Sequence, residues 1–127
     1  MKTAVHTKGA PEAIGPYSQA VATTGLLFLS GQIGLDPASG ELVSGGVEVE
    51  TRRVLDNLTA VLAVAGLGLD AVVKTTIYLV DLSDFGAVNQ IYGSYFSEPF
   101  PARATVGVAT LPRGARVEID AVAVRAK

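Results

Sequence analysis

The stretch that decides the fold class of this chain is VEVETRRVLDNLTAVLAVAGLGLDAVVKTTIYLV, residues 47–80. Its first half repeats apolar residues at helical spacing, at Val47, Val54, Leu58, Val61, Leu62 and Ala65. This period predicts a helix over 47–65, for which Gly66 is a natural end. The β-branched residues that follow predict a strand over 71–80. A long amphipathic helix that leads into an apolar strand is typical of helices layered on a sheet.

The flanking sequence predicts one more helix and four more strands. The expected strands cover 18–24, 26–32, 103–109 and 116–125, with a turn at 112–114 between the last two. We expect Ser83 to cap the second helix and Pro99 to follow its end. The buried side of that helix should carry Phe85, Val88, Tyr92, Tyr95 and Phe96. Residues 1–18 are rich in Gly and Pro and predict an extended arm.

The resulting order, β-β-α-β-α-β-β, predicts an α+β domain with one sheet and two helices on one of its faces. A chain of 127 residues is long enough for one such domain, 1–127, and too short for two. The strands are apolar on both faces, because Leu26 and Phe28 alternate with Leu27 and Leu29. Two helices can cover only one face, so we expect a second copy of the chain to cover the other, in an obligate homo-oligomer.

The composition excludes several classes of chemistry. The chain has no cysteine and a single histidine, His6, which excludes thiol catalysis, zinc–thiolate sites and sites built from several imidazoles. We therefore expect no metal and no cofactor. A pI near 5.3 argues against nucleic acid as a partner. The apolar stretches are far shorter than the roughly 20 residues of a membrane span, and no secretory signal precedes them, so we expect a cytoplasmic protein.

The most informative polar residues are an arginine and a glutamate in the last two predicted strands. Arg103 begins its strand within the otherwise apolar segment 100–106, and Glu118 lies on the polar face of the final strand. If the two strands pair suitably, the two side chains could flank one small pocket. A guanidinium can hold a carboxylate with two parallel hydrogen bonds, and a nearby carboxyl group can exchange a proton with water. The alternative interpretation is a structural salt bridge that closes the strand ends or joins subunits.

Four further positions could contribute to such a pocket. Tyr17 could donate a hydrogen bond over the pocket or simply hold the N-terminal arm. Ser30 and Gly31 end a strand, where a glycine permits the close approach of a ligand but is also common in a bulge or turn. Asn89 interrupts the apolar side of the second helix, and its spacing alone favours a contact with a neighbouring loop over a contact with substrate.

Seven short segments resemble the YjgF family, also called the Rid proteins. They are FPARATV at 100–106, VEI at 117–119, AIGPYSQ at 13–19, SGQ at 30–32, LDNL at 55–58, KTT at 74–76 and VN at 88–89. The resemblance covers nearly the whole chain. It implies a chorismate-mutase-like fold assembled as a homotrimer with a cleft between each pair of subunits. It also implies hydrolysis of reactive enamines and imines of the 2-aminoacrylate type to 2-oxo acids and ammonia.

The resemblance assigns roles by position. Arg103 would hold the substrate carboxylate, helped by the Gly31 backbone, and Glu118 would orient or deprotonate the attacking water. The side chains expected to line the cleft are Tyr17, Ser30, Asn89 and Thr105. Many family members have cysteine where this chain has Thr105, so regulation through a thiol is not expected here.

Two other functions compete with imine hydrolysis. RNA cleavage or inhibition of translation has been attributed to some relatives, but the acidic pI and the single His6 count against it. A non-catalytic regulator that binds small carboxylates would use the same arginine and would not need Glu118.

Overall fold

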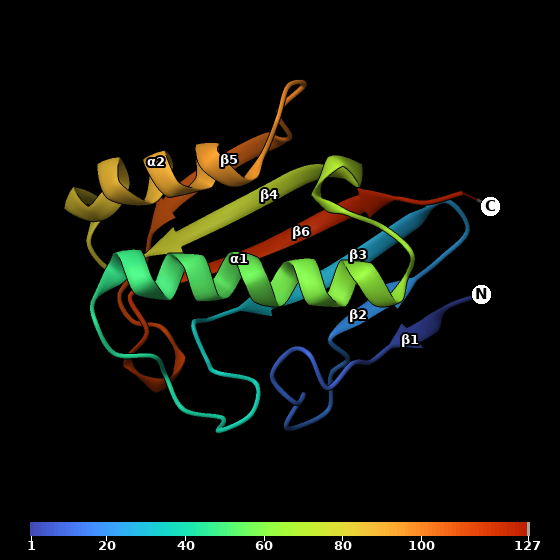
Figure 1. Ribbon diagram of the computed structural model, residues 1–127, viewed down its shortest axis with the longest axis horizontal. Helices are drawn as coiled ribbons and strands as arrows, with labels where there is room; N and C mark the ends of the chain where they lie inside the picture. The colour runs from blue at the N-terminus through green and yellow to red at the C-terminus, as the bar shows by residue number, and fades with distance from the viewer. Residues whose placement is uncertain (127) are drawn as a thin grey trace.

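The computed structural model describes residues 1–126, in which six strands form one sheet (Figure 1). The strands are β1 (Thr3–Val5), β2 (Ala20–Ala22), β3 (Leu26–Gln32), β4 (Val72–Leu79), β5 (Ala102–Gly107) and β6 (Val117–Val124). They lie in the order β1-β2-β3-β6-β4-β5, and only β4 and β5 are parallel to each other. The last strand of the chain therefore lies in the middle of the sheet, and β5 lies at its edge.

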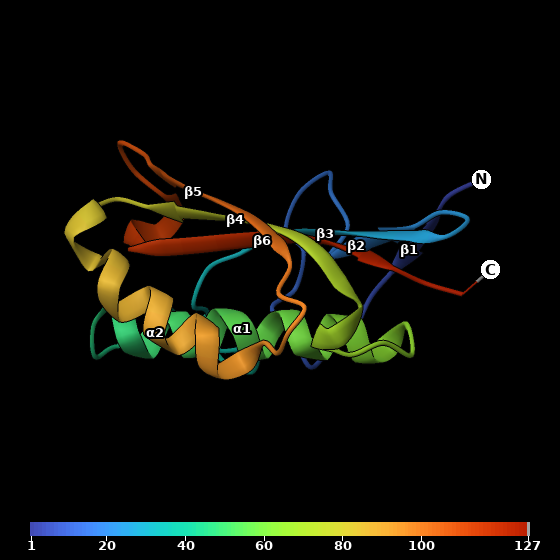
Figure 2. The same ribbon diagram turned by 90° about the horizontal axis from the view of Figure 1, so that it is seen from above.

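Two helices, α1 (Val47–Val64) and α2 (Phe85–Tyr95), cover one face of this sheet (Figure 2). The longer α1 lies across β3 and β6, and α2 lies beside it toward β4 and β5. Three short 3-10 helices complete the elements: η1 (Leu69–Ala71), η2 (Leu82–Asp84) and η3 (Pro112–Gly114). The α+β class and the placement of both helices on one face are confirmed.

The hydrophobic core lies between the helices and the sheet. Its fully buried members include Leu27, Leu55, Leu58, Leu62, Ile77, Leu79 and Ile119. Each side chain of this size contributes roughly 1.5–3 kcal/mol through burial, so this single interface supplies most of the stability. No helix in residues 1–126 is both long enough and apolar enough to cross a membrane.

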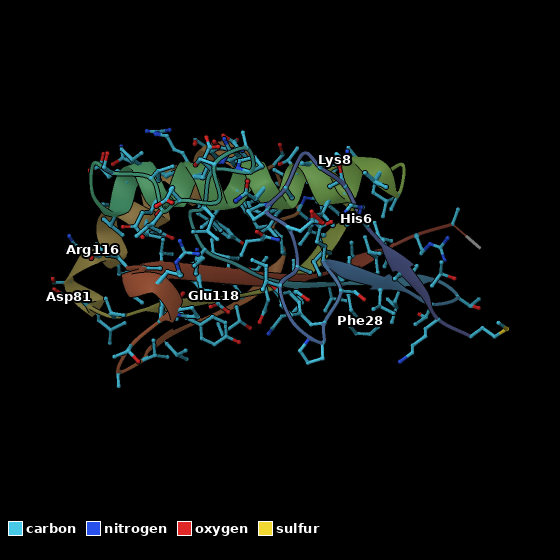
Figure 3. All side chains as sticks on the ribbon, turned by 90° about the horizontal axis from the view of Figure 1, so that it is seen from below. His6, Lys8, Phe28, Asp81, Arg116 and Glu118 are labelled. Atoms are coloured by element: carbon cyan, nitrogen blue, oxygen red, sulfur yellow. The ribbon has the colours of Figure 1, made fainter. Side chains whose placement is uncertain are left out.

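The opposite face of the sheet carries no helix, and we call it the open face. Its apolar residues include Phe28 on β3, Val106 on β5 and Val124 on β6, which are 46%, 41% and 45% exposed. Figure 3 shows Phe28 and Glu118 on this side, away from the helices. The prediction that the strands are apolar on both faces is confirmed, since the neighbours Leu27 and Leu29 face the core.

Two local expectations need correction, and one strand was not expected. Residues Thr3–Val5 of the extended N-terminal arm pair with β2 and add a strand to the sheet. Ser83 does not cap the second helix: it lies inside η2, where its N–H and hydroxyl both donate to the carboxylate of Asp81. Phe85 is not buried, because it sits at the start of α2 at the edge of the helix layer.

Candidate functional site

The first part of the candidate site is a cavity of about 460 Å³ between α2 and the start of β5, which we call the Arg103 pocket. It is lined by Asn89, Tyr92, Gly93, Phe100, Pro101 and Arg103. The pocket forms because β5 is the edge strand and α2 ends in a bend before it, so a gap opens between helix and strand. Its walls are mostly apolar, with one guanidinium and one amide.

Arg103 reaches back from β5 to the helix layer. Its Nη1 donates a 2.8 Å hydrogen bond to Oδ1 of Asn89 on α2. Its Cζ lies 5.0 Å from the centroid of the Tyr92 ring and 5.5 Å from that of Phe85. Within residues 1–126 no carboxylate forms an ion pair with it. The guanidinium therefore keeps free donors that can bind an external carboxylate.

Asn89 and Thr105 belong to the same side of the sheet as Arg103. Asn89 contacts Arg103 rather than a neighbouring loop, which corrects the interpretation favoured by its spacing. Thr105 lies two residues along β5 from Arg103 and points toward the helices. Its Oγ1 is buried and has no hydrogen-bond partner within the part of the chain that the structure describes. Thr105 does not itself line the Arg103 pocket.

The second part of the site is a cavity of about 200 Å³ around Glu118, which we call the Glu118 pocket. Its lining includes Glu12, Ile14, Tyr17, Gly31, Arg113 and Glu118. A bulge in β3 shapes it: Leu29 pairs with Ala121 and Gln32 with Ile119, so two residues, Ser30 and Gly31, lie opposite one.

Gly31 lies directly against the side chain of Glu118. A methyl group at Gly31 would lie 2.8 Å from Cδ and 3.1 Å from Cγ of Glu118. Only a glycine leaves room for the carboxyl group in this position. The close approach expected of this residue is therefore made by a side chain of the same protein.

The environment of Glu118 favours its neutral form. Burial raises the pKa of this carboxyl group, and the negative charge of Asp120, two residues along the same face of β6, raises the pKa further. Asp120 accepts a 2.9 Å hydrogen bond from the hydroxyl of Tyr78 on β4. A carboxylate with a raised pKa is a stronger base than an exposed one, so it is better suited to accept a proton and return it.

Of the remaining predicted residues, Tyr17 borders the Glu118 pocket and Ser30 does not. Tyr17 is 54% exposed at its rim, carried by the arm that precedes β2. Gln19 fixes this arm, since its buried side-chain amide accepts from the N–H of Thr7 and donates to the carbonyl of Pro11. Ser30 does not line the pocket, and its hydroxyl donates to the carbonyl of Ser18.

The two pockets lie on opposite faces of the sheet. The Arg103 side chain contacts α2 on the helix face, whereas Glu118 lies on the open face. Their strands are not neighbours, because β4 lies between them, with Arg103 level with Thr75 and Glu118 level with Tyr78. Within one chain the two residues form neither a salt bridge nor a common pocket. The suitable pairing on which a shared pocket within one chain depended does not occur.

A family model described as Endoribonuclease L-PSP matches residues 7–125. The chain belongs to this family. It is the YjgF, or Rid, family that the sequence segments resemble.

Individual relatives of this Rid-family chain are similar over almost their whole length. The chain is 56% identical over 125 residues to Protein DfrA of Myxococcus xanthus, covering 97% of this chain and 95% of that protein. It is 53% identical over 125 residues to 2-iminobutanoate/2-iminopropanoate deaminase of Mus musculus, covering 98% and 93%. The crystal structure of a putative endoribonuclease from Thermotoga maritima covers the whole of both chains with a TM-score of 0.96 at 49% identity.

Sequence reasoning missed the aromatic residues that contact Arg103. The sequence pattern places Phe85 and Tyr92 on the buried side of the second helix. It assigns Phe100 and Pro101 only to the segment 100–106 that resembles the family. A signal was present: Phe85, Asn89 and Tyr92 follow at spacings of four and three, which places them on one stripe of α2. That this stripe contacts Arg103 follows only from the position of β5 beside α2, which the local sequence does not encode. In residues 1–126 no group of three or more acidic, histidine or cysteine side chains could hold a metal ion.

Proposed function

We propose that this chain is a hydrolase that converts 2-imino acids to 2-oxo acids and ammonia, acting as a homotrimer with its sites between subunits. The deaminase names of several relatives at 50–53% identity support the reaction. The chemistry of the two pockets supports the substrate class, because a free guanidinium suits a small carboxylate and a proton-exchanging carboxyl group suits hydrolysis.

The observation that carries the proposal is the division of the site between two faces. The Arg103 pocket contains a guanidinium and no acid. The Glu118 pocket contains a second arginine, Arg113, but its guanidinium donates to the carbonyl of Gly40 and forms no ion pair with Glu118 among residues 1–126. The two can act on one small molecule only if a second copy brings its open face against the Arg103 edge of the first. The exposed apolar residues of the open face, such as Phe28 and Val124, supply a surface suited to that contact.

In such a site, Arg103 binds the substrate carboxylate through two parallel hydrogen bonds and so fixes the adjacent C=N group. Asn89 holds one edge of the guanidinium and leaves other donors for the substrate. Gly31 brings the chain close to Glu118 and keeps the carboxyl group in place. Tyr17 at the rim limits the access of bulk water to the pocket.

The reaction needs one water molecule and one proton relay. Ionised Glu118 takes a proton from water as the oxygen adds to the imine carbon, and the C=N double bond becomes a C–N single bond. The protonated carboxyl group then returns the proton to nitrogen. In the second half of the reaction the same carboxyl group takes the hydroxyl proton of the carbinolamine and passes it to the nitrogen. The oxygen forms the C=O double bond as the C–N bond breaks, which releases ammonia and the 2-oxo acid. Positioned proton transfer contributes typically about 10²–10⁴-fold, which suffices for an imine that already hydrolyses slowly in water.

The test is hydrolysis of imino acids made in situ by an amino-acid oxidase, with semicarbazide as the trap for remaining imine. The wild-type protein should lower the rate of semicarbazone formation, and Arg103→Ala should abolish this effect while the protein stays folded and oligomeric. Unchanged activity in Arg103→Ala would reject the assigned role.

The competing functions are tested with the same preparations. RNA cleavage by the wild type that disappears in Arg103→Ala would favour a ribonuclease. Binding of a 2-oxo acid that survives Glu118→Ala, with no deaminase activity in the wild type, would favour a carboxylate-binding regulator.

A further inference from the structure

We propose that Phe85 and Tyr92 of α2 are positioning residues that hold the Arg103 guanidinium in its carboxylate-binding orientation through their ring faces. This inference rests on the proposed function in that it takes Arg103 as the group that binds the substrate carboxylate. It goes beyond that function by assigning a role to two aromatic residues that contact no substrate atom in the mechanism.

The three residues of α2 that contact Arg103 form one stripe. Asn89 accepts the hydrogen bond from Nη1, and the rings of Phe85 and Tyr92 lie one helical turn to either side of it. The distances from Cζ to the two ring centroids, 5.5 Å and 5.0 Å, are within the range of cation–π attraction. The guanidinium is thus bound to Asn89 through one N–H and lies within cation–π distance of both rings.

Tyr92 is itself held rigidly. Its ring is 3% exposed and stacks on Phe96, with 4.4 Å between the centroids. Its hydroxyl forms a 2.7 Å hydrogen bond with Oγ1 of the fully buried Thr75. Thr75 is the residue of β4 that lies level with Arg103 on β5. The ring is therefore anchored to the same level of the sheet from which the arginine side chain begins.

This anchoring matters because a free arginine side chain has many rotamers. Binding a carboxylate with two parallel hydrogen bonds requires one of them, and the entropy lost on binding is smaller when the side chain is already ordered. The ring contacts are made through the π faces and use none of the N–H groups in a hydrogen bond, so the donors that Asn89 does not take stay available for the ligand. Burial raises the pKa of Tyr92, so its phenol stays neutral at neutral pH and acts through its ring rather than as an acid.

The experiment measures binding of 2-oxobutanoate, which needs no turnover, by calorimetric titration. Tyr92→Phe keeps the ring and should bind within about twofold of wild type. Tyr92→Leu removes it and should weaken binding about tenfold, the effect of one partly buried cation–π contact. The ¹⁵N–¹H resonance of Arg103 Nε, assigned with Arg103→Lys, should lose its ring-current shift in Tyr92→Leu and keep it in Tyr92→Phe.

Tyr95→Leu is the matched control. It removes a tyrosine from the same helix whose hydroxyl bonds to Asp56 of α1 and which does not contact Arg103, so binding and the Arg103 resonance should stay as in wild type. Phe85→Leu is the second test variant, since Phe85 is 36% exposed and its loss leaves the core intact. We expect it to weaken binding about threefold with the same change in the resonance.

Wild-type affinity in folded Tyr92→Leu, or in Phe85→Leu if Tyr92→Leu does not fold, would overturn the inference. So would an equal loss in Tyr95→Leu. A wild-type protein that binds 2-oxobutanoate through Arg103 and the two rings but never hydrolyses imines would refute the proposed function and leave this inference standing.

Discussion

Replacing Gly31 by alanine should separate activity from stability. Gly31 does not adopt positive φ, so its backbone accepts an alanine. The new methyl group would lie 2.8 Å from Cδ of Glu118, where ordinary contact begins at 3.4 Å. The carboxyl carbon must therefore retreat by at least 0.6 Å, and the carboxylate oxygen, which lies closer still, must move farther.

The cost of this displacement differs between folding and catalysis. The carboxyl group is the far end of a flexible side chain, so a changed rotamer costs the folded protein about 1 kcal/mol or less. Misplacement of a reacting group by about 1 Å can cost about 100-fold in rate. We expect Gly31→Ala to lower kcat/KM for imine hydrolysis about 100-fold while the midpoint of chemical denaturation changes little.

The assay is the semicarbazide-coupled measurement together with denaturation in urea. Gly86→Ala is the matched control, because a methyl group at Gly86 on α2 meets no atom within 4 Å and the residue has no assigned role. It should keep wild-type activity. A folded Gly31→Ala protein with wild-type kcat/KM would show that Glu118 does not act from the position seen here.

Three further perturbations test other parts of the reasoning. Asp120→Asn removes a negative charge that raises the pKa of Glu118, so Glu118 stays ionised to lower pH and the acidic limb of the kcat/KM profile should shift to lower pH. An acidic limb that does not move would argue against Glu118 as the base. Phe28→Glu places a charge on the open face and should convert the proposed trimer to monomers without activity, as measured by analytical ultracentrifugation. An active trimer in this variant would mean that another surface joins the subunits. Asn57→Ala leaves the carbonyls of Ile33 and Leu35 without their side-chain donor, so the free energy of unfolding measured by urea titration should fall by about 2–3 kcal/mol. A loss below about 0.5 kcal/mol would show that water replaces the amide.

The fold could be predicted from the sequence wherever a single segment carries a complete pattern. The helical period of 47–65 gives α1 to within one residue, and the apolar run around Gly25 gives β3 with its observed bounds. The strand β1 could not be predicted, because three residues such as Thr3–Val5 carry no periodicity of their own. They become a strand through pairing with β2, a contact that the local sequence does not encode.

The candidate site illustrates a different limit. The residue types of Arg103 and Glu118 indicated a carboxylate clamp and a proton carrier, and alternation along each strand placed each of them on a face. What alternation cannot give is which face of one strand matches which face of another, because that depends on strand order. Here β4 separates the two strands, Arg103 contacts α2 on the helix face, and Glu118 lies on the open face.

The division of the candidate site between the two faces of the sheet also explains why a small acidic chain can have so apolar a sheet. A site completed within one chain would let the open face become polar, as in other one-sided sheets. In the proposed trimer, a site shared between copies requires the face that carries Glu118 to be a contact surface, and Phe28 and Val124 are exposed apolar residues of that face. Assembly and catalysis then depend on the same face, so activity should appear with the same concentration dependence as the oligomer. A dilution series in which activity per chain stays constant while the oligomer dissociates would break this link.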